Sequence, residues 1–88
     1  MILIISPRAE KQLRKLPRFD QAAIAQKIRA LRSADIRNEE KLSGYKDIFR
    51  IRVGDYRIVY RKMSQSIYII LIRHRRDVYR LLKEMLDN

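Results

Sequence analysis

The sequence contains no cysteine, which excludes disulfide bonds, thiolate metal sites and a cysteine nucleophile. It has one histidine, too few for a histidine-rich metal site, and two glycines, too few for a glycine loop that cradles phosphate. The longest apolar run, residues 67–72, is too short to span a bilayer, and residues 2–5 do not form a signal peptide. We therefore expect a cytoplasmic protein that binds no membrane and uses no metal or other cofactor.

Acidic residues are also scarce. The 88 residues include 10 Asp and Glu against 21 Lys and Arg, so the formal net charge is +11, and 14 of the cations are arginine. Hydrophobic residues make up 47%, too many for a disordered basic tail, and the length predicts a single domain over residues 1–88. A domain this small has little stability to spare. We infer that the charge serves a polyanion: a nucleic acid, an anionic membrane or an acidic protein.

Hydrophobic periodicity predicts an α+β fold with the element order β-α-α-β-β-β-α. Ser6 and Pro7 suit the start of a helix, and Pro17 separates that helix from the next. The predicted strands are residues 1–5, 47–53, 56–61 and 67–72, and the predicted helices are residues 7–16, 19–32 and 75–88. We read the polar residues 33–43 as a loop. The prediction is a helical hairpin packed on a mainly antiparallel four-stranded sheet, with all helices on one face and residues 67–72 as the central strand.

A two-residue turn at Gly54 and Asp55 would place Arg52 opposite Arg57 in a hairpin. Strand alternation then gives one apolar face for the helices to cover, made of Phe49, Ile51, Val53, Tyr56, Ile58 and Tyr60. The opposite face carries Arg50, Arg52, Arg57 and Arg61. Like charges opposite each other destabilise a sheet, and a phosphate would relieve the repulsion by taking the planar guanidinium fork. The alternative is a solvated face that happens to be basic.

A second basic group, residues 73–76, follows directly after the last predicted strand, and Tyr79 lies in the first turn of the last predicted helix. RNA can be cut without a metal if its 2′-hydroxyl attacks the adjacent phosphate, which needs cations at the phosphate, a base and an acid. Histidine ionises near neutral pH, so His74 is the best candidate for acid or base, whereas the guanidinium of Arg52 hardly deprotonates. Tyr79 could stack on a base or share the proton transfer. The alternatives are a structural or solvated His74 and a Tyr79 packed on the core.

Three segments together, residues 41–44, 49–60 and 72–79, resemble the RelE branch of the RelE/ParE toxin superfamily, and the similarity covers essentially the whole chain. The resemblance implies a toxin that enters the ribosomal A site and cleaves mRNA there without a metal, leaving a cyclic phosphate or a 3′-phosphate. It also implies a cognate antitoxin. An acidic, partly disordered antitoxin that folds on binding would suit the charge of +11.

The resemblance also implies the site residues. The expected catalytic residues are Arg50, Arg52, Arg57, His74, Arg75 and Tyr79. The expected RNA-binding residues are Lys46, Arg61, Arg73 and Arg76, of which Arg76 could also take the place of Arg75. The sequence departs from the family pattern in having Arg52 where the best-known relatives have a lysine proposed as the general base, and Arg73 at a usual glycine position. Base and acid therefore stay unassigned.

Two other functions stay open. The ParE branch shares the fold but inhibits DNA gyrase by binding it, and its members generally lack the arginine and tyrosine constellation. The other is a catalytically silent module that binds RNA or the ribosome. It stays open because binding and cleavage need the same cations. The residues favour an endoribonuclease that acts on mRNA in the ribosome and so inhibits translation.

Overall fold

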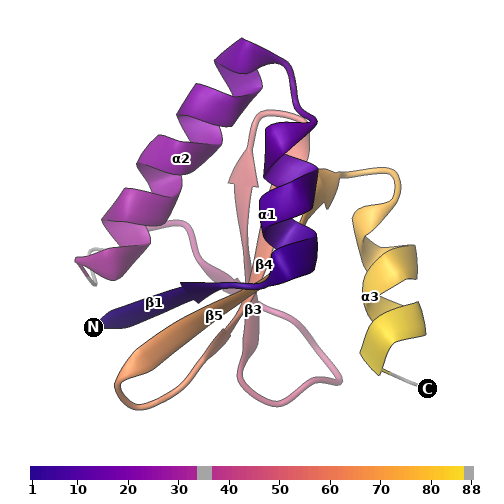
Figure 1. Ribbon diagram of the computed structural model, residues 1–88. Helices are drawn as coiled ribbons and strands as arrows, with labels where there is room; N and C mark the ends of the chain where they lie inside the picture. The colour runs from indigo at the N-terminus through magenta and orange to yellow at the C-terminus, as the bar shows by residue number, and fades with distance from the viewer. Residues whose placement is uncertain (34–36, 87–88) are drawn as a thin grey trace.

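The computed structural model describes residues 1–33 and 37–86, which form one five-stranded sheet flanked by three helices (Figure 1). The strands are β1 (Ile2–Ile5), β2 (Glu40–Lys41), β3 (Ile48–Val53), β4 (Tyr56–Lys62) and β5 (Ser66–His74). The helices are α1 (Pro7–Arg14), α2 (Arg18–Arg32) and α3 (Val78–Leu86). The strand order is β1-β5-β4-β3-β2, with β1 parallel to β5 and the other pairs antiparallel. None of the helices within residues 1–33 and 37–86 combines the length and the hydrophobicity that a transmembrane span requires.

This architecture confirms the α+β class and the helical hairpin on a mainly antiparallel sheet. The predicted strand count of four was wrong, because the stretch read as a loop contains β2, which pairs with β3 through two residues. The strand predicted to be central, at residues 67–72, belongs to β5, which is an interior strand between β1 and β4, whereas the middle strand of the five is β4. Parts of two predicted segments, residues 34–36 and 87–88, lie outside the described residues.

The start of α1 follows the sequence prediction. Ser6 caps the helix by accepting a hydrogen bond from the backbone N–H of Ala9 at 3.0 Å, and Pro7 takes the first helical position. The Ser6 hydroxyl also donates to the carbonyl of Ile70 at 3.0 Å. One buried serine thus fixes where α1 begins and ties this end of the helix to β5.

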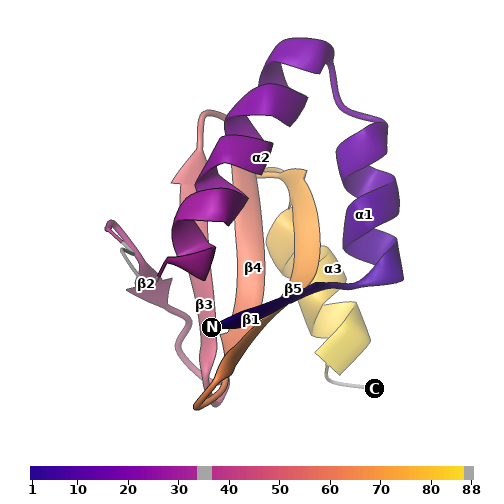
Figure 2. The ribbon, with the colours of Figure 1, turned by 60° about the vertical axis from the view of Figure 1, so that its left-hand side comes forward.

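The helices do not all lie on one face of the sheet. Figure 2 shows α1 and α2 in front of the strands and α3 behind them. The core is accordingly divided in two: one cluster lies under α1 and α2 and includes Ile24 and Ile58, and the other lies under α3 and includes Val59 and Leu82. The prediction of a single helix-covered face was therefore wrong for α3. The apolar stripe of α3 needs an apolar partner, and β5 supplies one because it is apolar on both sides.

The hairpin of β3 and β4 has the predicted register. Gly54 adopts a φ of +60° in the two-residue turn, Arg52 pairs with Arg57, and Phe49 pairs with Tyr60. The predicted apolar face belongs to the cluster under α1 and α2. The opposite face is only partly basic, because α3 covers Ile48 and Val59 there.

A β-bulge in β5 decides which of its residues face which side. The register between β4 and β5 shifts between Val59 and Tyr60, so Ile70 is the extra residue. Ile69 packs with the cluster under α1 and α2, both Ile70 and Leu71 pack under α3, and Ile72 returns to the first cluster. A bulge reverses the alternation for everything that follows it. The reversal continues through the last two residues of the strand, Arg73 and His74.

Candidate functional site

Arginines from three adjacent strands meet near the Gly54 turn. Arg57 of β4 pairs with Arg52 of β3 on one side and with Arg73 of β5 on the other, so the three form one row across the sheet. Arg50 lies two residues before Arg52 on β3 and therefore shares its face. We call Arg50, Arg52, Arg57 and Arg73 the arginine cluster. It occupies the sheet face that carries α3, beside the start of that helix.

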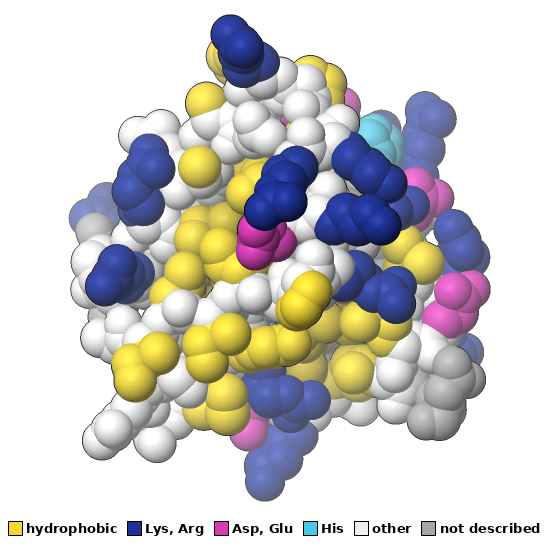
Figure 3. All heavy atoms as spheres, viewed as in Figure 1, with side chains coloured by type: hydrophobic (Ala, Val, Ile, Leu, Met, Phe, Trp, Pro, Cys, Tyr) yellow, Lys and Arg dark blue, Asp and Glu magenta, His cyan; other side chains and the backbone are white. Residues whose placement is uncertain are grey.

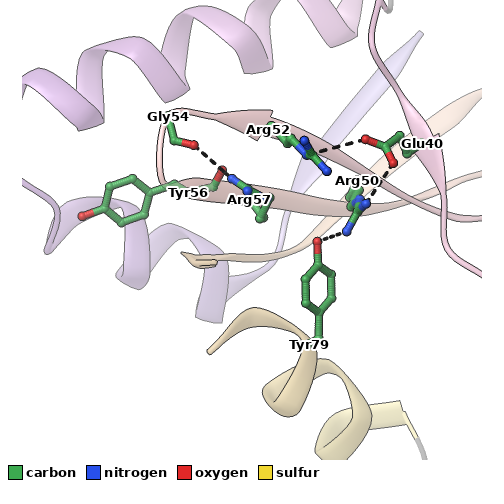
Figure 4. A network of polar contacts seen from close by, with 7 residues as sticks. All are labelled: Glu40, Arg50, Arg52, Gly54, Tyr56, Arg57 and Tyr79. Carbon is green, nitrogen blue, oxygen red and sulfur yellow. Dashed lines mark hydrogen bonds and ion pairs between the residues drawn. The ribbon is translucent and has the colours of Figure 1, made fainter. Parts of the chain in front are cut away.

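Tyr79 of α3 and Glu40 of β2 hold Arg50 between them (Figure 4). One guanidinium nitrogen donates to the Tyr79 hydroxyl, another donates to Glu40 at 2.8 Å, and the guanidinium lies 5.3 Å from the Tyr79 ring centroid. The hydrogen bond from Arg50 and its charge hold the pKa of the Glu40 carboxyl below its ordinary value, and Glu40 raises the pKa of Arg50. Glu40 also pairs with Arg52, with 3.6 Å between Oε1 and Nε. The acid is therefore ionised, and it neutralises part of the cluster.

Arg57 has no such counter-ion. Its guanidinium donates to the backbone carbonyls of Gly54 at 3.0 Å and Tyr56 at 2.9 Å, and it forms no ion pair in the described part of the chain. It also stands between two other arginines in the row. This arrangement holds a guanidinium fork in place with unsatisfied charge, which suits a phosphate group.

His74 lies on the other side of the sheet from the cluster. It pairs with Tyr56, which belongs to the core cluster under α1 and α2, and the two rings contact edge to face with centroids 5.6 Å apart. Figure 4 shows the Tyr56 ring pointing away from Arg50 and Arg52. The structure therefore does not bring His74 together with the arginines, and the bulge in β5 is the reason.

The other basic residues expected at the site are spread around it. Arg75 lies at the β3–β4 turn, where its Nε is 3.5 Å from Asp55 and its backbone N–H donates to the Asp55 carbonyl at 2.7 Å. Arg76 is exposed, and its backbone N–H donates to His74 Nδ1 at 3.2 Å. Arg61 shares the face of Arg57 but lies beyond the buried Val59, where it donates to the Lys46 carbonyl at 3.3 Å. Lys46 and Arg61 thus stand at the far end of the hairpin.

Sequence reasoning missed Glu40 and gave Arg73 too small a part. Glu40 stood in a segment read as loop; the adjacent pair of acids in an otherwise basic chain was the available signal. Arg73 was expected only as an RNA contact, yet it completes the row with Arg52 and Arg57. Among the described residues, no group of three or more His, Cys, Asp or Glu side chains is placed to hold a metal ion.

Comparisons with known proteins agree with this fold. The crystal structure of the RelB–RelE antitoxin–toxin complex from Methanococcus jannaschii matches with a TM-score of 0.76 and 24% identity, over 89% of this chain and 96% of that one. The isolated Escherichia coli RelE toxin matches with a TM-score of 0.69 and 28% identity, over 97% of this chain and 98% of that one. A comparison with curated proteins found no significant match.

The fold is that of a small toxin of the RelE/ParE superfamily, with a RelE-like structure. Residues 3–79 match the model of the family described as the ParE toxin of type II toxin–antitoxin systems. That match covers most of the chain, so the chain belongs to this toxin family.

Proposed function

We propose that this toxin is a ribosome-dependent endoribonuclease that inhibits translation by cleaving mRNA in the ribosomal A site. The observation that carries the proposal is the row of Arg52, Arg57 and Arg73, in which the central guanidinium has no carboxylate partner among the described residues. The similarity to the E. coli RelE toxin supports the same class of activity. The toxin would act in the cytoplasm, where ribosomes and mRNA are its targets.

The chemistry is attack of the RNA 2′-oxygen on the adjacent phosphorus. The 2′-hydroxyl gives up its proton to water, the bond from phosphorus to the 5′-oxygen breaks, and that oxygen takes up a proton, which leaves a cyclic phosphate. The arginine row stabilises the negative charge that builds on the phosphate oxygens in the transition state. The phosphate displaces Glu40 from Arg50 and Arg52, so one anion replaces another. Much of the rate then comes from holding the three reacting atoms in line.

Tyr79 is the candidate for a role at the leaving 5′-oxygen or at the base of the cleaved codon. Its hydroxyl accepts a hydrogen bond from Arg50, which holds the phenolic proton at the edge of the arginine cluster. We assign to it either donation of that proton to the leaving 5′-oxygen or stacking on the base of the cleaved codon. We assign no proton transfer to His74, which lies on the opposite side of the sheet.

The test is to produce the toxin without an antitoxin and to map mRNA ends by primer extension, with and without ribosomes. The proposal expects arrested translation and mRNA cut inside codons only when ribosomes are present. The matched family model favours a second candidate, the gyrase inhibition expected of the ParE branch. Continued translation with broken chromosomes would establish that candidate instead. Ribosome binding without any cleavage would point to a silent binding module.

The proposed partner is a cognate antitoxin, as in the RelB–RelE complex from M. jannaschii. Two features of this chain suit an acidic, partly disordered segment that folds on binding: the net charge of +11, and the apolar side chains exposed along the edge strand β1, where Ile2 is 62% exposed. Co-expression with the neighbouring gene should restore growth, and the two proteins should purify together.

A further inference from the structure

A second basic region lies outside the arginine cluster, in a pocket between α1 and the end of β5. Its volume is about 400 Å³, within the range of small-ligand sites. Its lining includes Arg8, Lys11, Gln12, Lys15, Tyr56 and His74. In Figure 3 the single histidine, drawn in cyan, lies among basic side chains on this face of the molecule.

The three cations on the α1 side of the pocket form no ion pairs within the described residues. Arg8, Lys11 and Lys15 come from α1 and the residue that follows it, and no ion pair involves them within residues 1–33 and 37–86. Glu10, the acid on α1, pairs with Arg14 instead. Lys11 and Lys15 lie four residues apart at the end of α1, so their charges repel each other unless an anion lies between them.

Asp77 is the acid that lines the pocket, and it is already engaged. Its carboxylate lies 3.7 Å from Arg73 and 3.5 Å from Arg80. It therefore does little to neutralise the lysines of α1. The pocket keeps an excess of positive charge in the free protein, and an incoming anion would remove it.

Neutral donors stand beside these cations. The Gln12 side-chain carbonyl accepts from the backbone N–H of Ile72 at 2.9 Å, which leaves the Gln12 amide N–H groups without a partner in the described chain. His74 Nδ1 accepts from the backbone N–H of Arg76 at 3.2 Å, so the neutral ring carries its proton on Nε2. Both residues thus have donors left for a ligand.

The pocket also has an apolar wall. Leu16, Tyr56 and Ile72 line it, and the Tyr56 ring is fixed by its edge-to-face contact with His74. A carboxylate side chain or a free phosphate would use the cations and leave this wall uncovered. A nucleotide uses both, since its base packs on aromatic and apolar surface while its phosphate takes the charges.

We propose that this pocket binds one nucleotide, with the phosphate between Lys11 and Lys15 and the base against Tyr56. Arg73 belongs to the arginine cluster and also lines this pocket, so an RNA strand leaving the cluster can turn around the end of β5 and continue into it. At that point β5 has no neighbouring strand on its β1 side, because β1 pairs only with residues 66–69. This path of the RNA strand from the arginine cluster into the pocket rests on the proposed function, whereas binding of the nucleotide does not.

The test is an NMR titration of the full chain carrying Arg57→Ala, which removes the central arginine of the other site. The chain has one histidine, so its imidazole signals report the pocket without ambiguity. The probes are adenosine 5′-monophosphate, adenosine, inorganic phosphate, an acidic peptide and an RNA tetranucleotide. We expect the monophosphate to shift the His74 and Gln12 side-chain signals more strongly than adenosine or inorganic phosphate does.

Two double variants that each remove two positive charges distinguish a specific nucleotide site from non-specific electrostatic attraction. Lys11→Gln with Lys15→Gln should weaken binding of the monophosphate by roughly tenfold or more, because both charged contacts to the phosphate are lost. Arg29→Gln with Lys83→Gln, which changes exposed residues on α2 and α3, should leave binding nearly unchanged. Equal losses in the two double variants would overturn the site.

The remaining outcomes are equally decisive. Inorganic phosphate or the acidic peptide binding as tightly as the monophosphate would overturn the nucleotide assignment, as would absence of any shift. The tetranucleotide should bind at least as tightly as the monophosphate. Weaker binding of the tetranucleotide would overturn the path of the RNA strand into the pocket and leave a free nucleotide as the ligand. If ribosomal mRNA is not cut but the pocket binds the monophosphate, the proposed function fails and this site stands.

Discussion

Replacing Arg57 by alanine separates the role of the arginine cluster in RNA chemistry from its role in folding. The guanidinium makes two hydrogen bonds to backbone carbonyls near an exposed turn, at 3.0 and 2.9 Å. Each such bond contributes ~0.5–1.5 kcal/mol, and water can partly replace it. Removing the charge also relieves repulsion from Arg52 and Arg73, worth ~0.2–1 kcal/mol for each pair on a sheet. The free energy of unfolding should therefore fall by only about 1 kcal/mol.

The expected effect on RNA is much larger. A hydrogen bond to a charged group contributes ~1.5–3 kcal/mol, so losing the Arg57–phosphate contact should weaken RNA binding by roughly 10- to 150-fold. If the contact strengthens in the transition state, the rate of cleavage should fall by about 10²–10³-fold. The dependence of log K on log salt should become shallower by ~0.7 for the single-stranded phosphate contact that is lost.

Single-turnover cleavage on programmed ribosomes, followed by primer extension, measures this rate. Arg57→Lys should recover part of the binding and little of the rate, because an ammonium keeps the charge but not the planar fork. Arg29→Ala removes an exposed arginine from α2 and is the matched control. Cleavage by Arg57→Ala at the unmodified rate, or an equal loss in Arg29→Ala, would contradict a role for Arg57 at the phosphate.

Four further predictions concern the hydroxyl of Tyr79, the carboxyl of Glu40 and the buried Tyr60. Tyr79→Phe keeps the ring contact with Arg50 but loses the hydroxyl, so cleavage should slow while ribosome binding holds; an unchanged rate would leave only a stacking role. Glu40→Gln frees Arg50 from its counter-ion, so RNA should bind more tightly in a filter-binding assay, and weaker binding would contradict this role. The pKa of Glu40 is lowered in the folded state, so this carboxylate stabilises the fold at pH values above its ordinary pKa of 4.5. That stabilisation should be lost as the pH falls through the lower pKa of the folded state, and NMR of the carboxyl group can follow the loss. Burial and the hydrogen bond to Glu39 raise the pKa of Tyr60, so the neutral phenol stabilises the fold at pH values below its ordinary pKa of 10.0. That stabilisation should be lost as the pH rises through the higher pKa of the folded state. In an ultraviolet titration Tyr60 should be the last tyrosine to ionise, and Tyr60→Phe should remove that late phase.

The hairpin could be predicted because every rule that sets it is local. A two-residue turn with Gly54 first fixes the register, and the alternation of Phe49 to Val53 fixes which side is buried. The start of α1 was equally accessible, since Ser6 and Pro7 carry capping information within three residues of the helix end. Arg50, Arg52 and Arg57 were found as a cluster by this reasoning alone.

The rest depended on contacts between distant segments. Strand β2 has two residues and exists because Glu40 and Lys41 can pair with β3, which leaves no periodic signal. The position of α3 on the opposite face also had no local signal, because an amphipathic stripe states that a partner is needed but not which one. Its placement brings Tyr79 to Arg50 across 29 residues of sequence.

The amino-acid order alone determined the alternating strands, the helix starts and the excess of arginine, because periodicity and capping act over a few neighbouring residues. Tertiary structure decided which basic residues stand together. One extra residue at Ile70 reverses the sides of Arg73 and His74, giving Arg73 to the arginine cluster and His74 to the pocket beside α1. The free energy that sets such a bulge comes from packing β5 between two apolar layers at once, and no single segment of the chain contains that information.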